Sequence, residues 1–129
     1  MMTIYMLPGS TAPHENDLND SDKRNLLDHF ETTNYEIVVD GSGIDWEKID
    51  EVEVVVASRD KGPSGWFIRN IYFGGQERYH VGVYSGRNEL VLPNLSLPAA
   101  RYVVRIIAYY LRNRVKYHGP TDFIATVED

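Results

Sequence analysis

The chain of 129 residues contains no cysteine. Disulfide bonds, thiolate metal ligands and cysteine nucleophiles are therefore excluded, and the composition is compatible with a reducing compartment. No segment reaches the roughly 20 apolar residues that span a bilayer. The N-terminal MMTIYMLPG lacks the basic region, long apolar core and cleavage site of a signal peptide. We therefore expect a cytoplasmic protein without a membrane span.

The common signatures of catalysis are also missing. No GxSxG, HExxH, GxGxxG or P-loop pattern occurs, and the glycines at 41–43 and 74–75 fit turns rather than phosphate-binding loops. His14 and His29 lie near acidic residues, but no HxH or HxxxH spacing fixes a coordination geometry. The sequence thus predicts no metal site and no cofactor, and it favours a protein that is not an enzyme.

The composition fits one globular domain. With 43% hydrophobic and 25% charged residues the chain can bury one core, and its length leaves no room for two full domains. We expect an N-terminal strand, acidic loop and short helix in residues 1–33, one α+β domain in residues 34–118, and a C-terminal tail in residues 119–129.

Charge is divided unevenly along the chain. Residues 1–66 carry fourteen acidic and five basic side chains (net −9), residues 67–118 carry two and eight (net +6), and residues 119–129 add −3. The first interpretation is that these parts complement each other within the fold or across a dimer. The alternative is a basic patch for an anionic partner, although a chain with a net charge of −6 is a poor candidate for general nucleic-acid binding.

The clearest predicted element is a helix over residues 98–114. Apolar side chains at intervals of three and four form one side of it, namely Ala99, Tyr102, Val103, Ile106, Ile107, Tyr110 and Leu111. The opposite side carries a cationic stripe with one aromatic, made by Arg101, Arg105, Tyr109 and Arg112. Pro98 suits the first turn, Ser96 can cap it, and Gly119-Pro120 prevents continuation.

The chain before this helix predicts short strands. They are expected in residues 2–7, 35–41, 44–60, 65–75, 76–86 and 87–97, and a short helix capped by Ser21 is expected in residues 21–32. Short Gly-rich links between consecutive strands indicate an antiparallel meander. Because the long helix follows the strands instead of alternating with them, the fold class is α+β.

The run YEIVVDGSGIDWEKIDEVEVVVA, the further hairpins and the single amphipathic helix that follows them resemble the bacterial pleckstrin-homology-like (PH-like) domains over about residues 34–114. The resemblance implies a bent antiparallel sheet or partly open barrel of about five to seven strands, closed by one C-terminal helix. It also implies a binding or oligomerisation module. It assigns no functional residue, because the basic lipid-binding loop of some eukaryotic members has no counterpart in this sequence beyond Arg59 and Lys61.

The candidate binding residues lie on the basic part of the chain. Arg78, His80 and Tyr84 share one face of a predicted strand, and the stripe Arg101, Arg105, Tyr109 and Arg112 lies on the outer side of the helix. If the two faces adjoin they form an anion site, in which arginine forks bind carboxylate or phosphate and histidine titrates near neutrality. However, a helix that covers the sheet with its apolar side points its arginines away from the sheet, so a salt-bridged or solvated surface is the alternative.

Three functional hypotheses follow. The first is a non-catalytic module that binds a protein partner or itself, because nine tyrosines suit an interface and no catalytic motif is found. The second is a small-molecule anion binder or small enzyme that uses the Arg78, His80 and Tyr84 cluster with the basic side of the helix. The third is nucleic-acid binding through the helix arginines.

Overall fold

The computed structural model describes residues 4–9, 11–56, 78–124 and 126–128. The strand predicted in residues 65–75 lies outside the described residues. The elements are β1 (Ile4–Met6), η1 (Glu15–Asp17), α1 (Asp20–Leu27), β2 (Phe30–Thr32), β3 (Glu36–Val39), β4 (Ser42–Asp45), η2 (Trp46–Lys48), β5 (Glu51–Val56), β6 (Tyr79–Ser85), β7 (Asn88–Leu95), α3 (Leu97–Tyr110), β8 (Val115–His118), η3 (Thr121–Phe123) and β9 (Thr126–Glu128). The predicted α+β class is confirmed.

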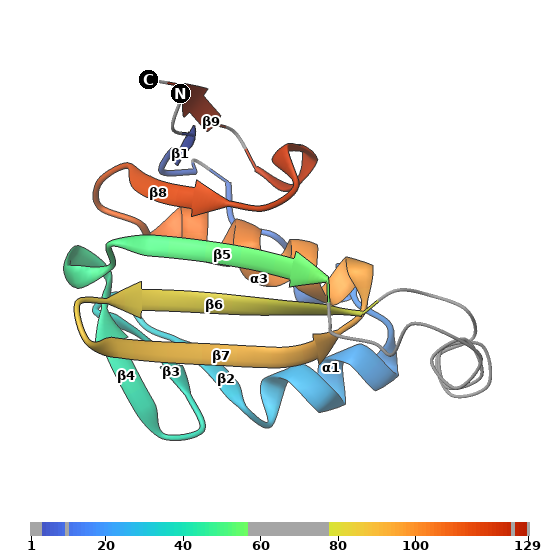
Figure 1. The fold of residues 1–129 in the computed structure, drawn as a ribbon. Coiled ribbons are helices and arrows are strands. Elements are labelled where there is room, and N and C mark those ends of the chain that lie inside the picture. Colours follow the sequence, from blue (N-terminus) through green and yellow to red (C-terminus); the bar gives the residue numbers. More distant parts are fainter. Residues whose placement is uncertain (1–3, 10, 57–77, 125, 129) are drawn as a thin grey trace, which may run out of the picture.

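The strands form two sheets (Figure 1). One has six strands in the order β7-β6-β5-β8-β1-β9, and the other has three in the order β2-β3-β4. The predicted meander is confirmed for β6 and β7, which pair antiparallel. Strand β5 pairs antiparallel with β6 directly, whereas the meander placed the strand predicted in residues 65–75 between them. The prediction of a wholly antiparallel sheet is wrong, because β8 pairs parallel to β5, with Val52 opposite Tyr117. Strand β8 arrives there only after the chain has passed through α3, and such a long crossover permits a parallel pairing.

The prediction of a single strand over residues 44–60 is also wrong. Strand β4 ends at Asp45, the short η2 turn follows, and β5 begins at Glu51. The two strands belong to different sheets, so the turn moves the chain from one sheet to the other. Local alternation of apolar and polar residues does not reveal this change, because both strands keep it.

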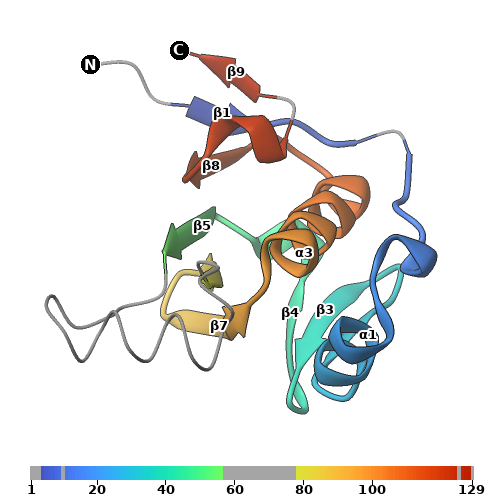
Figure 2. The same cartoon turned by 90° about the vertical axis from the view of Figure 1, so that its right-hand side faces the viewer.

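Helix α3 lies between the two sheets (Figure 2). The prediction that one helix closes the sheet at the C-terminus is wrong, since β8, η3 and β9 follow α3. Six of the seven residues of the predicted apolar side are buried, namely Ala99, Tyr102, Val103, Ile106, Ile107 and Leu111. Ala100, Val104 and Ala108 are buried as well, because strands pack on both sides of the helix. Only a narrow stripe with Arg105 and Tyr109 remains exposed.

Of the two ends of α3, only the start matches the prediction. Ser96 caps the start as predicted, accepting a hydrogen bond from the Ala99 N–H at 3.2 Å. The helix ends at Tyr110, four residues before the predicted Arg114. Residues 115–118 form β8 instead, because alternate burial of Val115 and Tyr117 lets this segment join the sheet.

Both chain ends join the six-stranded sheet. The strand predicted in residues 2–7 is confirmed as β1, which pairs antiparallel with β8 and with β9, so that Tyr5 lies opposite both Lys116 and Val127. The predicted helix over residues 21–32 is shorter than expected. Asn19 caps it instead of Ser21, and the chain becomes strand β2 at Phe30, which pairs with Val39.

Candidate functional site

The seven predicted binding residues occupy separate parts of the molecule. His80 and Tyr84 lie on β6, where they alternate with buried Val81 and Val83 and so face away from α3. Arg78 lies near the start of α3, Arg101 and Arg105 lie along its exposed stripe, and Tyr109 and Arg112 lie at its end. The sheet therefore separates His80 and Tyr84 from the residues on α3, Arg78 lies apart from both near the start of α3, and the seven residues do not form one anion site.

Tyr84 and His80 have local partners. The Tyr84 hydroxyl donates to Glu53 Oε1 at 3.1 Å, and its ring lies so close to Gly82 that a β-carbon there would come within 2.8 Å of the hydroxyl oxygen. Burial, and then the hydrogen bond to Glu53, raise the pKa of Tyr84. His80 Nδ1 accepts from the backbone N–H of Asn94 at 3.1 Å. The carboxylates near Tyr84 make this face a poor site for anions.

His80 stabilises an irregularity in the sheet. The register between β6 and β7 shifts between Tyr79 and Val81, and Asn94 in the opposite strand has φ of 56°. A bulge leaves a backbone N–H outside the regular ladder of hydrogen bonds. Here the His80 ring accepts a hydrogen bond from the backbone N–H of Asn94. This hydrogen bond explains the presence of His80 at this position by a structural role.

Arg78 lines a hollow of about 580 Å³ where the N-termini of both helices meet. At its base the Ser96 hydroxyl donates to Asp22 Oδ2 at 2.8 Å, and both side chains are buried. Asp22 belongs to α1 and Ser96 caps α3, so this contact joins the two helices. The carboxylate already supplies the negative charge that helix N-termini favour.

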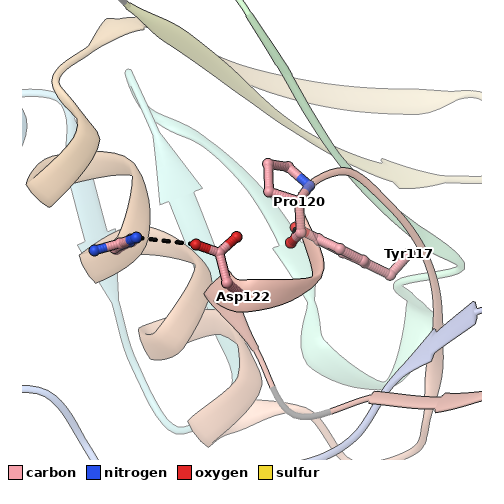
Figure 3. Close-up of polar contacts among 4 residues, drawn as sticks. Tyr117, Pro120 and Asp122 are labelled. Carbon is pink, nitrogen blue, oxygen red and sulfur yellow. Dashed lines mark hydrogen bonds and ion pairs between the residues drawn. The ribbon is translucent and has the colours of Figure 1, made fainter.

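Arg101 of the helix stripe holds η3 against α3 (Figure 3). Its Nη2 donates to Asp122 Oδ2 at 3.0 Å, and its guanidinium lies 5.5 Å from the centre of the Phe123 ring. On the other side of the short turn the Tyr117 hydroxyl donates to the Pro120 carbonyl at 2.7 Å (Figure 3). The basic part of the chain and its acidic end are thus paired here within the fold, as the charge division suggested.

Alkaline pH provides a test of the Tyr117 contact. Burial, and then the negative charge of Asp122, raise the pKa of Tyr117 above its ordinary value of 10.0. The folded state therefore holds this proton more tightly than the unfolded state, so the resulting stability is complete below pH 10 and is lost as the pH rises further. We expect the free energy of unfolding of Tyr117→Phe, measured by urea denaturation, to fall less steeply above pH 10 than that of the natural protein. Equal slopes for the two proteins would contradict the assignment.

Arg105 differs from the other arginines of the stripe. Its side chain is exposed, and within the described ranges no hydrogen bond or ion pair reaches it. It lines a groove of about 420 Å³ between the N-terminal segment and η3, hereafter the Arg105 groove. The other lining residues are Leu7, Gly9, Thr11, Ala108, Asp122, Phe123 and Ile124.

A group of aromatic side chains lies at the end of α3. We call this group, together with the neighbouring Arg112, the aromatic corner. Its residues are Tyr35, Trp46, Tyr109, Tyr110 and Arg112. Trp46 stacks on Tyr110 with ring centres 5.1 Å apart and an angle of 9°, and Tyr110 meets Tyr109 edge to face at 5.0 Å. The Trp46 indole N–H donates to the Thr33 carbonyl at 2.7 Å. Trp46 and Tyr110 are therefore held in fixed positions.

Tyr35 and Arg112 complete the aromatic corner. Tyr35 is 79% exposed, the highest value among the exposed large hydrophobic side chains of the described residues. Arg112 Nη2 donates to the Asn34 carbonyl at 2.8 Å. Both line a small hollow of about 120 Å³ together with Trp46 and the acidic side chains Asp45 and Glu47.

Tyr35 and Trp46 were missed as site residues, although a signal for them exists in the sequence. Asp40 and Gly41 both have positive φ, which is the turn that an Asp-Gly pair favours in a two-residue hairpin. Counting outward from that turn places Tyr35 opposite Trp46. In the structure the backbone N–H of Trp46 does donate to the Tyr35 carbonyl, at 3.1 Å.

Comparison of the chain with family models, curated proteins and solved structures gives no match. No helix in the described part of the chain is long and apolar enough to cross a membrane. Within the same residues no three histidine, aspartate or glutamate side chains are grouped as metal ligands would be, and His29 contacts Asp40 instead, at 2.6 Å. The site must therefore be judged by its geometry.

Proposed function

We propose that the chain is a non-catalytic protein-interaction module and that the aromatic corner is its contact surface. The observation that carries this proposal is the 79% exposure of Tyr35 beside the fixed Trp46–Tyr110 stack and Arg112. Tyrosine, tryptophan and arginine are the residues enriched at the centres of protein interfaces. Most of the Tyr35 side chain is unburied in the lone chain, so its surface is available for a partner to cover.

The fixed geometry of the aromatic corner favours binding. Ordering flexible side chains on association reduces affinity, and tyrosine and tryptophan have only two side-chain torsions to fix. Here Trp46 is only 2% exposed and is held by its hydrogen bond to Thr33 and by its stack on Tyr110, so it supports the aromatic corner from within. The exposed aromatic contact residues are Tyr35 and Tyr109. A partner would meet a surface that is largely in place before contact.

The charges around the aromatic corner fit a second copy of the same chain as partner. Arg112 lies on one side of the hollow, and Asp45 and Glu47 also line it. A two-fold interface brings the same patch of both copies together, so a patch that holds both signs can be complementary to itself. Rotation of one copy can then place the Arg112 of each chain near the acidic side chains of the other.

Tyr35→Ala is expected to weaken self-association by at least about tenfold, or about 1.4 kcal/mol, because truncation removes a central aromatic contact. Sedimentation equilibrium or size exclusion with light scattering measures the dissociation constant. Leu27→Ala is the matched control, since Leu27 is 40% exposed on α1 and outside the aromatic corner. A protein that stays monomeric up to about 1 mM, where even an association of about 4 kcal/mol is visible, would overturn the proposal of a second copy.

A charge exchange tests the orientation. Arg112→Glu and Glu47→Arg are each expected to weaken the dimer, because each brings like charges together, and the double variant is expected to recover part of the loss. Recovery distinguishes a contact between Arg112 and Glu47 across the interface from a change in folding. If the double variant is as weak as the sum of the single ones, the proposed pairing is wrong.

A relationship to the PH-like domains remains a proposal. The features that support it are the hairpins β3–β4 and β6–β7, the antiparallel pairing of β5 with β6, sheets that stay partly open, and an amphipathic helix directly after β7. The parallel pairing of β8 with β5 and the place of α3 between two sheets differ from the arrangement that the resemblance implied. The proposed function does not depend on this relationship.

The other two hypotheses have less geometric support. An enzyme or anion site at Arg78, His80 and Tyr84 requires these side chains to converge, and they lie on different parts of the fold with local partners for His80 and Tyr84. Nucleic-acid binding requires a row of available cations. Arg101 is paired with Asp122 and Arg112 contacts a backbone carbonyl, so the predicted row is interrupted.

A further inference from the structure

We propose that the Arg105 groove binds a small organic carboxylate with an apolar body. This site is separate from the aromatic corner, and the proposal does not rest on the proposed interaction function. The groove of about 420 Å³ runs beside α3 between the segment that contains Gly9 and the η3 turn. The groove is open to solvent, so a ligand would lie against it and stay partly exposed.

The cation that would bind the ligand is Arg105. Within the described part of the chain it has no ion pair, whereas the neighbouring Arg101 is paired with Asp122 at 3.0 Å. A guanidinium presents two parallel N–H donors that match the two oxygens of a carboxylate. Arg105 is thus a positive group at a concave surface, and the other two charges nearby, those of Arg101 and Asp122, neutralise each other.

The remaining lining explains why the ligand should have an apolar body. The apolar surface open to a ligand comes mainly from Leu7 and Ile124, which are partly exposed, because Phe123 and Ala108 are only 3% and 8% exposed. The floor is held in place from both sides. Gly9 N–H donates to the Ala108 carbonyl at 2.6 Å, and Arg101, with Asp122, fixes the η3 turn (Figure 3).

Asp122 favours a carboxylate over a phosphate group. Its side chain lines the groove and carries a negative charge, which Arg101 balances. A ligand with a single negative charge needs one cation, and Arg105 provides it. A phosphate dianion carries a second negative charge and would need a second cation, and Arg101 is already engaged with Asp122.

Binding can be measured with phenylacetate as the carboxylate probe, using amide chemical shifts of isotopically labelled full-length protein. We expect saturable shifts at Thr11, Ala108 and Phe123, with benzyl alcohol and inorganic phosphate producing none that saturate. Arg105→Met keeps the length of the side chain and removes the charge, so it should weaken phenylacetate binding by at least about tenfold. Arg24→Met, an exposed arginine of α1, is the matched control and should leave binding unchanged.

Asp122→Asn tests the selectivity. It removes the negative charge and makes Arg101 available, so inorganic phosphate should then produce saturable shifts at the groove. Thermal denaturation of each variant establishes that it is folded, and the experiment can be repeated with Tyr35→Ala so that self-association does not interfere. Absence of saturable shifts with phenylacetate, or equal binding by Arg105→Met and the natural protein, would overturn the proposed site. A failure of Asp122→Asn to admit phosphate would overturn the role of Asp122.

Discussion

Replacement of Val104 by aspartate is expected to prevent cooperative folding. Val104 is 0% exposed in α3, in the arc between the predicted apolar side and the cationic stripe. A carboxylate at this position would be buried without a partner, which costs several kcal/mol, whereas the whole free energy of unfolding of a domain is typically about 5–15 kcal/mol. Urea denaturation followed by circular dichroism measures the effect, and size exclusion detects expanded or aggregated protein.

Two further variants make this result specific to burial. Arg105→Asp places the same side chain at the next position, where it is exposed, so the free energy of unfolding should change by about 0.5 kcal/mol or less. Val104→Ala removes only two methyl groups and should cost about 2 kcal/mol. A Val104→Asp protein that unfolds cooperatively near the midpoint of the natural protein would show that α3 is covered on one side only.

Ser96→Ala is expected to lower the free energy of unfolding by about 2–4 kcal/mol. Loss of the cap on α3 accounts for about 1 kcal/mol, and loss of the partner of buried Asp22 accounts for about 1–3 kcal/mol more. Because one hydroxyl both caps α3 and donates to α1, its removal should cost more than an ordinary capping change. Urea denaturation at neutral pH measures the difference.

A double-mutant cycle isolates the contact between the two helices. Asp22→Ala and Ser96→Ala should together cost less than the sum of the two single changes, with a coupling of about 1–3 kcal/mol. Asn25→Ala, an exposed change on the same helix α1, is the control and should be additive with Ser96→Ala. Additivity of Asp22→Ala and Ser96→Ala within about 0.5 kcal/mol would show that the hydrogen bond does not join the helices energetically.

The candidate sites were accessible to sequence reasoning to different degrees. The Asp40-Gly41 turn fixes the hairpin register and therefore the proximity of Tyr35 and Trp46, so two of the five residues of the aromatic corner could have been derived together. The contact of Trp46 with Tyr110 could not, because it joins the hairpin to a helix more than sixty residues away in the sequence. Helical spacing does place Tyr110 on the apolar side of α3, but it does not say what lies against it.

The cationic stripe shows the same division. Spacing placed Arg101, Arg105 and Tyr109 on the outer side of α3, and the structure places them along one stripe. Only the tertiary structure reveals that Asp122 forms an ion pair with Arg101 and that Arg105 lies beside a groove. Charge counting along the chain suggested such pairing in general, since the C-terminal part is acidic and the part before it is basic.

By itself, the sequence determined the local features of this protein: the start of α3 at its Ser96 cap, the alternation that makes β6 a strand, the hairpin turns and the α+β class. These depend on spacing and on capping and turn residues, which act over a few positions. The tertiary structure alone decided the parallel pairing of β8 with β5, the burial of α3 on both sides, and the separation of the basic residues. Those features depend on which distant surfaces meet, and a periodic apolar face specifies that it will be buried without specifying its partner.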